Sequence, residues 1–124
     1  EVEITGPFPA GKIGTSRENR KAAPEGENHE HSEMYPEFAD IADQEDFPEV
    51  AYVMRNIAKA EQMHEARYLA LLANIEAGTV FKKDRPVKWK CNNCGYLHEG
   101  TEAPEICPAC AHPQAHFEIW AENW

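Results

Sequence analysis

Residues 89–110, WKCNNCGYLHEGTEAPEICPAC, contain two CxxC motifs that determine how the C-terminal part of the chain folds. Twelve residues separate Cys94 from Cys107, so each motif can form a tight turn that offers two thiolates to one tetrahedral ion. No secretory signal is visible, which favours a metal site in a reducing compartment over disulfides. The spacing alone leaves zinc and iron open, because both ions accept four thiolates.

The segment around these motifs, residues 89–124, is rich in aromatic and turn residues and is predicted to form a compact metal-binding module. Gly95, directly after the first motif, is expected to adopt a positive φ, which lets backbone N–H groups turn toward a sulfur. The preceding residues 79–88 carry several Lys and Arg side chains and are predicted to be a short linker.

Upstream of the linker, residues 25–78 are rich in Ala, Glu, Met and Leu, which predicts helices. The spacing of apolar residues indicates two helices, at about 25–44 and about 48–77, with Pro36 kinking the first. This segment is therefore predicted to be a helical hairpin. Because two helices cannot surround a core, we expect further helices to complete a bundle.

The first 24 residues contain several Gly and Pro residues and little periodicity, which predicts an extended connection. A long connection of this kind needs an element on each side. We therefore expect a preceding helical part, supplied by another chain or by a second copy of this one.

A second group of candidate ligands lies on the predicted helices. Glu27 and Glu30 are three residues apart on the first helix, and Glu61 and His64 are three apart on the second, so each pair shares a helix face. On the second helix this face also carries apolar residues, where charged groups are unfavourable unless they are paired or bind metal. A Glu-x-x-His motif facing carboxylates is typical of di-iron bundles, although an exposed acidic face remains the alternative.

Three nearby side chains are less clearly assigned. Tyr35 is either a core residue or a hydrogen-bond donor near the metal pair. His29 and His31 flank Glu30 and are expected to be solvated rather than ligands.

Charge and the length of apolar runs argue against two classes of function, nucleic-acid binding and membrane insertion. The 124 residues include 22 acidic and 12 basic side chains, which give a formal net charge of −10. Such a chain repels nucleic-acid phosphates, and it has no apolar run near the roughly 20 residues that a membrane span needs. We therefore expect a cytoplasmic protein that binds neither nucleic acid nor membrane.

With these motifs in hand, the chain resembles the rubrerythrin family over nearly its whole length. The leader resembles the family's crossover between helices, and residues 89–124 resemble its rubredoxin-like domain. The order and spacing of the motifs match: Glu27-Asn-His-Glu30, Glu33-Met34-Tyr35-Pro36, Ala60-Glu61-Gln62-Met63-His64-Glu65, Trp89-Lys90-Cys91, Cys94-Gly95-Tyr96 and Cys107-Pro108-Ala109-Cys110. The implied fold is mainly α: half of a ferritin-like four-helix bundle, followed by a small rubredoxin-like β-ribbon domain.

The resemblance also implies a role for each candidate residue. Glu27 and Glu61 would be iron ligands, with Glu61 bridging, and His64 would bind the second iron. Glu30 would bind or leave one iron as the redox state changes, and Tyr35 would hydrogen-bond near the di-iron centre. A separate mononuclear iron would be held by four thiolates, those of Cys91, Cys94, Cys107 and Cys110.

The activity implied by the resemblance is the reduction of hydrogen peroxide to water in protection against oxidative stress. Electrons would enter at the thiolate-bound iron from a rubredoxin or an NAD(P)H-dependent reductase, and the protein would be a homodimer or larger. The family's other two ligand-bearing helices are absent from this sequence, so half of the di-iron site would come from an N-terminal half-bundle chain or a second copy. The alternatives are an electron-transfer protein that uses only the thiolate-bound iron, and a zinc-ribbon adaptor.

Overall fold

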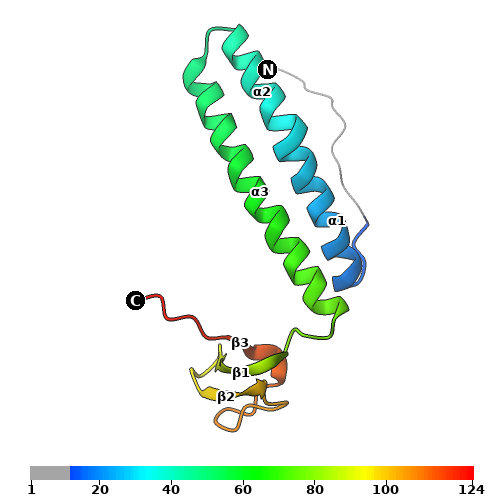
Figure 1. Cartoon of the computed structure of the whole chain (residues 1–124), viewed down its shortest axis with the longest axis vertical. Coiled ribbons are helices and arrows are strands. Elements are labelled where there is room, and N and C mark those ends of the chain that lie inside the picture. The colour runs from blue at the N-terminus through cyan, green and yellow to red at the C-terminus, as the bar shows by residue number, and fades with distance from the viewer. Residues whose placement is uncertain (1–11) are drawn as a thin grey trace, which may run out of the picture. The chain divides into compact units, whose positions relative to one another are not determined.

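The computed structural model describes residues 12–124, in which helices come first and strands follow (Figure 1). The chain divides into one unit that ends at Ala73 and another that covers Asn74–Trp124. The first is a helical hairpin, and the second contains a three-stranded antiparallel sheet. This order of elements confirms the predicted fold class.

The first arm of the hairpin begins earlier than predicted. It comprises α1 (Ser16–His29), the π-helix η1 (Glu30–Met34) and α2 (Tyr35–Gln44). The expected extended connection to residue 24 is therefore wrong from Ser16 onward, while its residues 1–11 lie outside the described part of the chain. A capping box explains the start: the Glu18 backbone N–H donates to Thr15 Oγ1, and the Thr15 N–H donates to the Glu18 carboxylate.

The interruption expected at Pro36 is a change of helix type. Pro36 has no N–H to donate, and it lies in the first turn of α2. Directly before it, the Tyr35 backbone N–H donates to the Glu30 carbonyl, five residues back, which is the π-helical pattern. The candidate ligand Glu30 therefore begins a short π-helical turn.

The second arm, α3 (Pro48–Glu76), lies within one residue of the predicted helix. Ala39, Ala42 and Ala51 are buried between α2 and α3, with Met54 packed against them. Larger apolar side chains such as Phe38 and Val50 remain exposed on the hairpin, as expected of two helices that cannot surround a core. Among the described residues, no helix combines the length and apolarity required to cross a membrane.

The sheet has the order β2-β1-β3, formed by β1 (Lys82–Cys91), β2 (Leu97–Glu102) and β3 (Phe117–Ile119). A short 3₁₀ helix, η2 (Gln114–His116), precedes β3. The linker predicted over residues 79–88 is therefore wrong from Lys82, because its basic residues belong to β1, where Lys82, Arg85 and Lys88 are exposed. A register irregularity between Lys82 and Val87 accommodates the proline of this strand.

The two CxxC turns have matching backbone hydrogen bonds. The Gly95 N–H donates to the Cys91 carbonyl, and the Ala111 N–H donates to the Cys107 carbonyl, both at 2.8 Å. Gly95 has φ +80°, which confirms the prediction, and Ala111 takes the equivalent place at φ +58°. One turn therefore uses glycine for a left-handed residue and the other tolerates an alanine, which is the less favourable choice.

We expect reciprocal substitutions at these positions to have opposite effects on stability. Gly95→Ala should lower the free energy of unfolding of the C-terminal unit by about 1–2 kcal/mol, since its new Cβ meets no atom within 4 Å but the backbone becomes strained. Ala111→Gly should raise it by up to about 1 kcal/mol. Urea denaturation of metal-loaded protein, followed by tryptophan fluorescence, measures both.

Ala109→Gly is the matched control, because Ala109 lies in the same turn without a positive φ. It should be destabilising. An Ala111→Gly variant that loses as much stability as Ala109→Gly would contradict the strain argument.

Candidate metal centres

The four cysteines come together at one end of the sheet. Cys91 ends β1, and it is buried together with Cys107 in the core that also contains Trp89 and Phe117. Cys110 is half-buried and Cys94 is exposed. The Sγ atoms of Cys91 and Cys110 are 3.7 Å apart, as are those of Cys94 and Cys107.

These sulfur separations fit a tetrahedral ion. A metal–sulfur distance of about 2.3 Å gives a tetrahedron with sulfur–sulfur edges of about 3.8 Å. The sulfurs therefore already have the spacing that a bound ion requires. Zinc and iron both suit this donor set.

The thiols in this group do not ionise equally. The His112 backbone hydrogen bond lowers the pKa of Cys110 to about 6. The Tyr96 backbone lowers the pKa of Cys94, but desolvation and the neighbouring thiols outweigh it and raise the pKa to about 12. The group therefore reaches four thiolates only when a cation compensates their charge.

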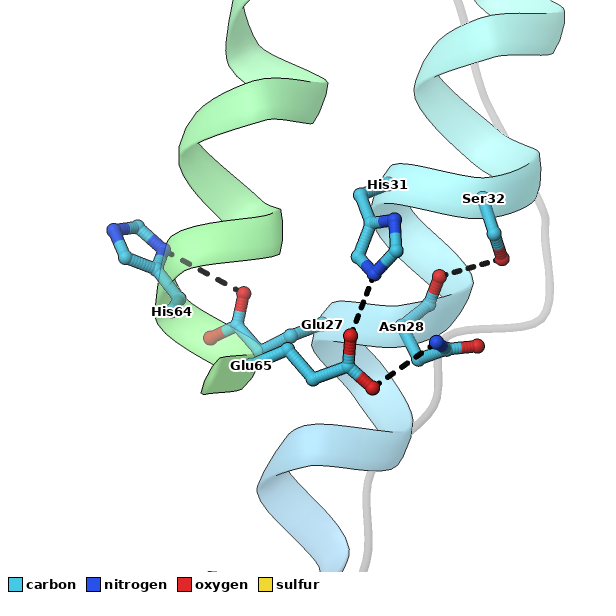
Figure 2. A network of polar contacts seen from close by, with 6 residues as sticks. All are labelled: Glu27, Asn28, His31, Ser32, His64 and Glu65. Carbon is cyan, nitrogen blue, oxygen red and sulfur yellow. Dashed lines mark hydrogen bonds and ion pairs between the residues drawn. The ribbon is translucent and has the colours of Figure 1, made fainter. Parts of the chain in front are cut away.

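The second group of ligands connects the two arms of the hairpin. Glu27 on α1 and Glu61 and His64 on α3 each place one ligand atom within 4.8 Å of the others. His64 Nδ1 lies 2.5 Å from Glu61 Oε2 and 3.5 Å from Glu27 Oε2. Figure 2 shows the contact between Glu27 and His64. The predicted ligands of the two helices thus lie together.

Burial and repulsion make this group unfavourable without a cation. Burial raises the pKa of Glu27, and the hydrogen bond and charge of Glu61 raise it further. Glu27 and Glu61 are half-buried, whereas His64 is exposed. Two carboxylates and an imidazole are suitable ligands for iron and similar ions. The donor set therefore fits a metal centre.

Glu30 and Tyr35 lie beside this group rather than in it. The charge of Glu30 raises the pKa of both Glu27 and Tyr35, so its carboxylate is near them, but Glu30 is not within the 4.8 Å group. Burial and the carboxylates of Glu61, Glu30 and Glu27 raise the pKa of Tyr35. Its hydroxyl therefore keeps its proton at neutral pH and remains a hydrogen-bond donor.

Sequence reasoning missed the environment of His31. His29 is exposed and pairs with Glu33 on its own helix, but His31 is half-buried and its Nε2 lies 2.7 Å from Glu65 Oε2 on α3. The expectation that His31 is solvated is therefore wrong.

Comparison with known proteins identifies two regions of the chain. The family model for rubrerythrin matches residues 1–72, and that for the rubredoxin-like domain of rubrerythrin matches residues 89–118. The chain is 52% identical over 124 residues to rubrerythrin of Nitratidesulfovibrio vulgaris, and 53% identical over 123 residues to that of Porphyromonas gingivalis. It aligns over 100% and 99% of its own length but spans only 65% and 62% of these relatives.

Two solved structures of nigerythrin are also similar. A mixed-valence state matches with a TM-score of 0.51 and 32% identity over 90% of this chain and 52% of the other. The fully reduced, all-ferrous state matches with a TM-score of 0.50 and 30% identity over 95% of this chain and 55% of the other. This chain therefore corresponds to about half of those molecules.

We expect metal binding at the cysteines to weaken as the pH falls from about 8 to about 5. Cys94 is protonated throughout this range and must release its proton to bind metal, and Cys110 also becomes protonated below about pH 6. For each proton that metal binding displaces, the metal affinity falls roughly tenfold for every unit by which the pH falls. Cobalt titrations followed by thiolate absorption measure this dependence.

The control for this experiment is His64→Ala, which alters only the helical group and should show the same pH profile at the thiolate site. A cobalt affinity that stays constant between these pH values would contradict the assignment of protons to the thiols.

Proposed function

We propose, because this chain belongs to the rubrerythrin family, that it takes part in the two-electron reduction of hydrogen peroxide to water. The family combines a di-iron centre with a rubredoxin-like domain. One observation carries the proposal: the chain holds two metal-binding groups of different chemistry. One has carboxylate and imidazole ligands, and the other has four thiols.

The helical group would hold the di-iron centre. Glu27, Glu61 and His64 would be ligands, with Glu61 as the bridging carboxylate. When bound, the iron pair supplies the two electrons that peroxide reduction requires, and its oxygen-rich ligands stabilise the oxidised form. Glu27 and His64 also line an open cavity of about 350 Å³, so a molecule as small as peroxide can reach them.

Glu30 and Tyr35 would adjust the surroundings of this centre. Glu30 lies close to Glu27 yet outside the tight ligand group, so its carboxylate can bind or withdraw as the charge of the centre changes. Tyr35 keeps its phenolic proton and can donate a hydrogen bond toward the carboxylates. Neither role requires movement of the helix backbone.

The thiolate group would hold one iron through which electrons enter. Cys94 is exposed, so the site reaches the protein surface, where a redox partner can approach it. The sequence has no glycine-rich nucleotide-binding loop. We therefore propose that the donor is another protein, either a rubredoxin or an NAD(P)H-dependent reductase.

Further ligands would come from outside this chain's described residues. Di-iron bundles of this type use a Glu from each of two helices and a Glu-x-x-His motif from each of two others. The described residues provide one helix of each kind: α1 carries Glu27, and α3 carries the Glu-x-x-His pair Glu61 and His64. We propose that an N-terminal half-bundle or a second copy provides the rest, within a homodimer or larger assembly.

A second candidate function is electron transfer by the thiolate site alone. It is favoured by the completeness of the four-thiol group within a single chain, whereas the helical group has three clustered ligands. A zinc-ribbon adaptor is a third candidate, because zinc fits the same sulfur spacing.

We expect Glu61→Ala and His64→Ala to lower peroxide turnover by at least about 100-fold. Loss of a metal ligand should exceed the 10–100-fold effect of losing a residue that supports one. The red absorption of the ferric thiolate site should be retained in both variants. Peroxide consumption with a reductase as donor, and the visible spectrum, measure the two properties.

Arg55→Met is the control for these variants, because Arg55 pairs with Asp40 and Asp43 rather than with a candidate ligand. Its turnover should equal that of the unaltered protein. Unchanged turnover in Glu61→Ala would contradict the assignment of Glu61 to the site of peroxide reduction.

Metal content distinguishes the same functions independently. Protein purified with any tightly bound companion should contain about three irons per chain if a partner completes the di-iron bundle, and about two if paired copies share one centre. About one iron per chain would favour the electron carrier. Zinc in place of iron, measured by elemental analysis, would exclude a redox role.

A further inference from the structure

A polar bridge connects the two arms of the hairpin beside the candidate ligands. His31 Nε2 lies 2.7 Å from Glu65 Oε2, and Asn28 Nδ2 donates to Glu65 Oε1 at 3.0 Å (Figure 2). We call Asn28, His31 and Glu65 the interhelical bridge. The side chains of His31 and Glu65 are only 16% and 21% exposed, so water competes weakly for this contact.

Each member of the bridge directly follows a candidate metal ligand in the sequence: Asn28 follows Glu27, His31 follows Glu30, and Glu65 follows His64. Neighbouring residues on a helix share a peptide unit and point about 100° apart around the axis. Fixing a bridge residue therefore fixes the backbone of its ligand while leaving the ligand side chain free to face the metal.

Fully buried apolar packing is sparse at this level of the hairpin. Within the described part of the hairpin, the buried residues are Pro24, Ala39, Ala42 and Ala51. The three alanines lie between α2 and α3, close to the turn that joins those helices, and Pro24 is on α1. Among these residues, Pro24 is the one near Glu27, so fully buried apolar packing at the level of Glu27 and His64 is limited to this side chain.

The π-helical turn gives a second reason for a polar contact between the helices at this level. His31 is the second residue of η1, and Glu30 is the first. A π-helical turn is less regular than the α-helix around it, so its own hydrogen bonds define the direction of Glu30 less firmly. The contact from His31 to α3 supplies a fixed point for this turn from outside the helix.

We propose that the interhelical bridge is a positioning device that holds the ligand-bearing turns of α1–η1 and α3 in register. The proposal rests on the proposed function, because it takes Glu27, Glu30, Glu61 and His64 to be metal ligands. A slip of one helical turn moves a residue by about 5.4 Å, more than the 4.8 Å within which the ligand atoms now lie. Smaller shifts already misplace ligands that must meet at one ion.

The test measures metal affinity of the helical group in the full chain. One equivalent of zinc first fills the thiolate site, because thiolates select zinc over carboxylate sites. Cobalt is then titrated, and its absorption reports binding to carboxylate and imidazole ligands. His31→Leu should weaken this binding by about tenfold or more, the usual effect of losing a residue that orients ligands.

Two further variants separate positioning from general stability. His31→Gln should restore most of the affinity, because the Gln Nε2 reaches about as far as His Nε2 and donates to the same carboxylate. Arg55→Met removes ion pairs between α3 and α2, at 2.7 and 3.0 Å, that involve neither a candidate ligand nor a residue next to one. It should leave cobalt affinity unchanged. Circular dichroism checks that helix content is the same in all variants.

Each outcome decides the proposal. If His31→Leu alters helix content, Asn28→Ala, which removes one of the two bonds to Glu65, should still weaken cobalt binding. Equal affinity in all variants, or an equal loss in Arg55→Met, would overturn the positioning role and leave the proposed function standing. If the unaltered protein, purified with any tightly bound companion, binds no cobalt beyond the zinc-filled site, the helical metal centre itself is wrong, and the bridge has no ligands to position.

Discussion

The crowding and desolvation of acidic side chains is the constraint on which this molecule depends. Two carboxylates are crowded between the helices, and four thiols are crowded at the end of the sheet. Burial raises the pKa of Glu27, and the hydrogen bond and charge of Glu61 raise it further. The Tyr96 backbone lowers the pKa of Cys94, but desolvation and the neighbouring thiols outweigh it, whereas the His112 backbone lowers the pKa of Cys110. A cation resolves both conflicts, so folding prepares each group for a metal.

The two units hold their ligands in different ways. Cys91 and Cys107 are themselves core residues, packed with Trp89 and Phe117, so the hydrophobic core and the metal site of the sheet are the same structure. In the hairpin, the buried alanines and the ligand group are separate. Ligand geometry there depends on polar contacts between helices, which are more directional than apolar packing and tolerate fewer substitutions.

The sequence predicted the parts whose chemistry is local. The CxxC spacing indicated the thiolate group, and Glu-x-x-His indicated which helix faces meet. The start of α1 was missed because Pro24 and nearby glycines outweighed the Thr15–Glu18 capping box. The extent of β1 was missed because several of its exposed positions are basic and resemble a linker. His31 could not be placed, since its partner is 34 residues away and only the tertiary structure joins them.

The π-helical turn at Glu30–Met34 changes which residues share a side of the first arm. In an uninterrupted α-helix, Tyr35 would be rotated roughly 80° from Glu27, because they are eight residues apart. A π-helical turn takes up one additional residue, so Tyr35 comes to the angular place of a residue seven positions on, about 20° from Glu27. The π-helical turn thus keeps the phenol on the side occupied by the carboxylates that raise its pKa, despite the eight-residue spacing. Without the π-helical turn, the same eight-residue spacing would direct Tyr35 away from the metal ligands.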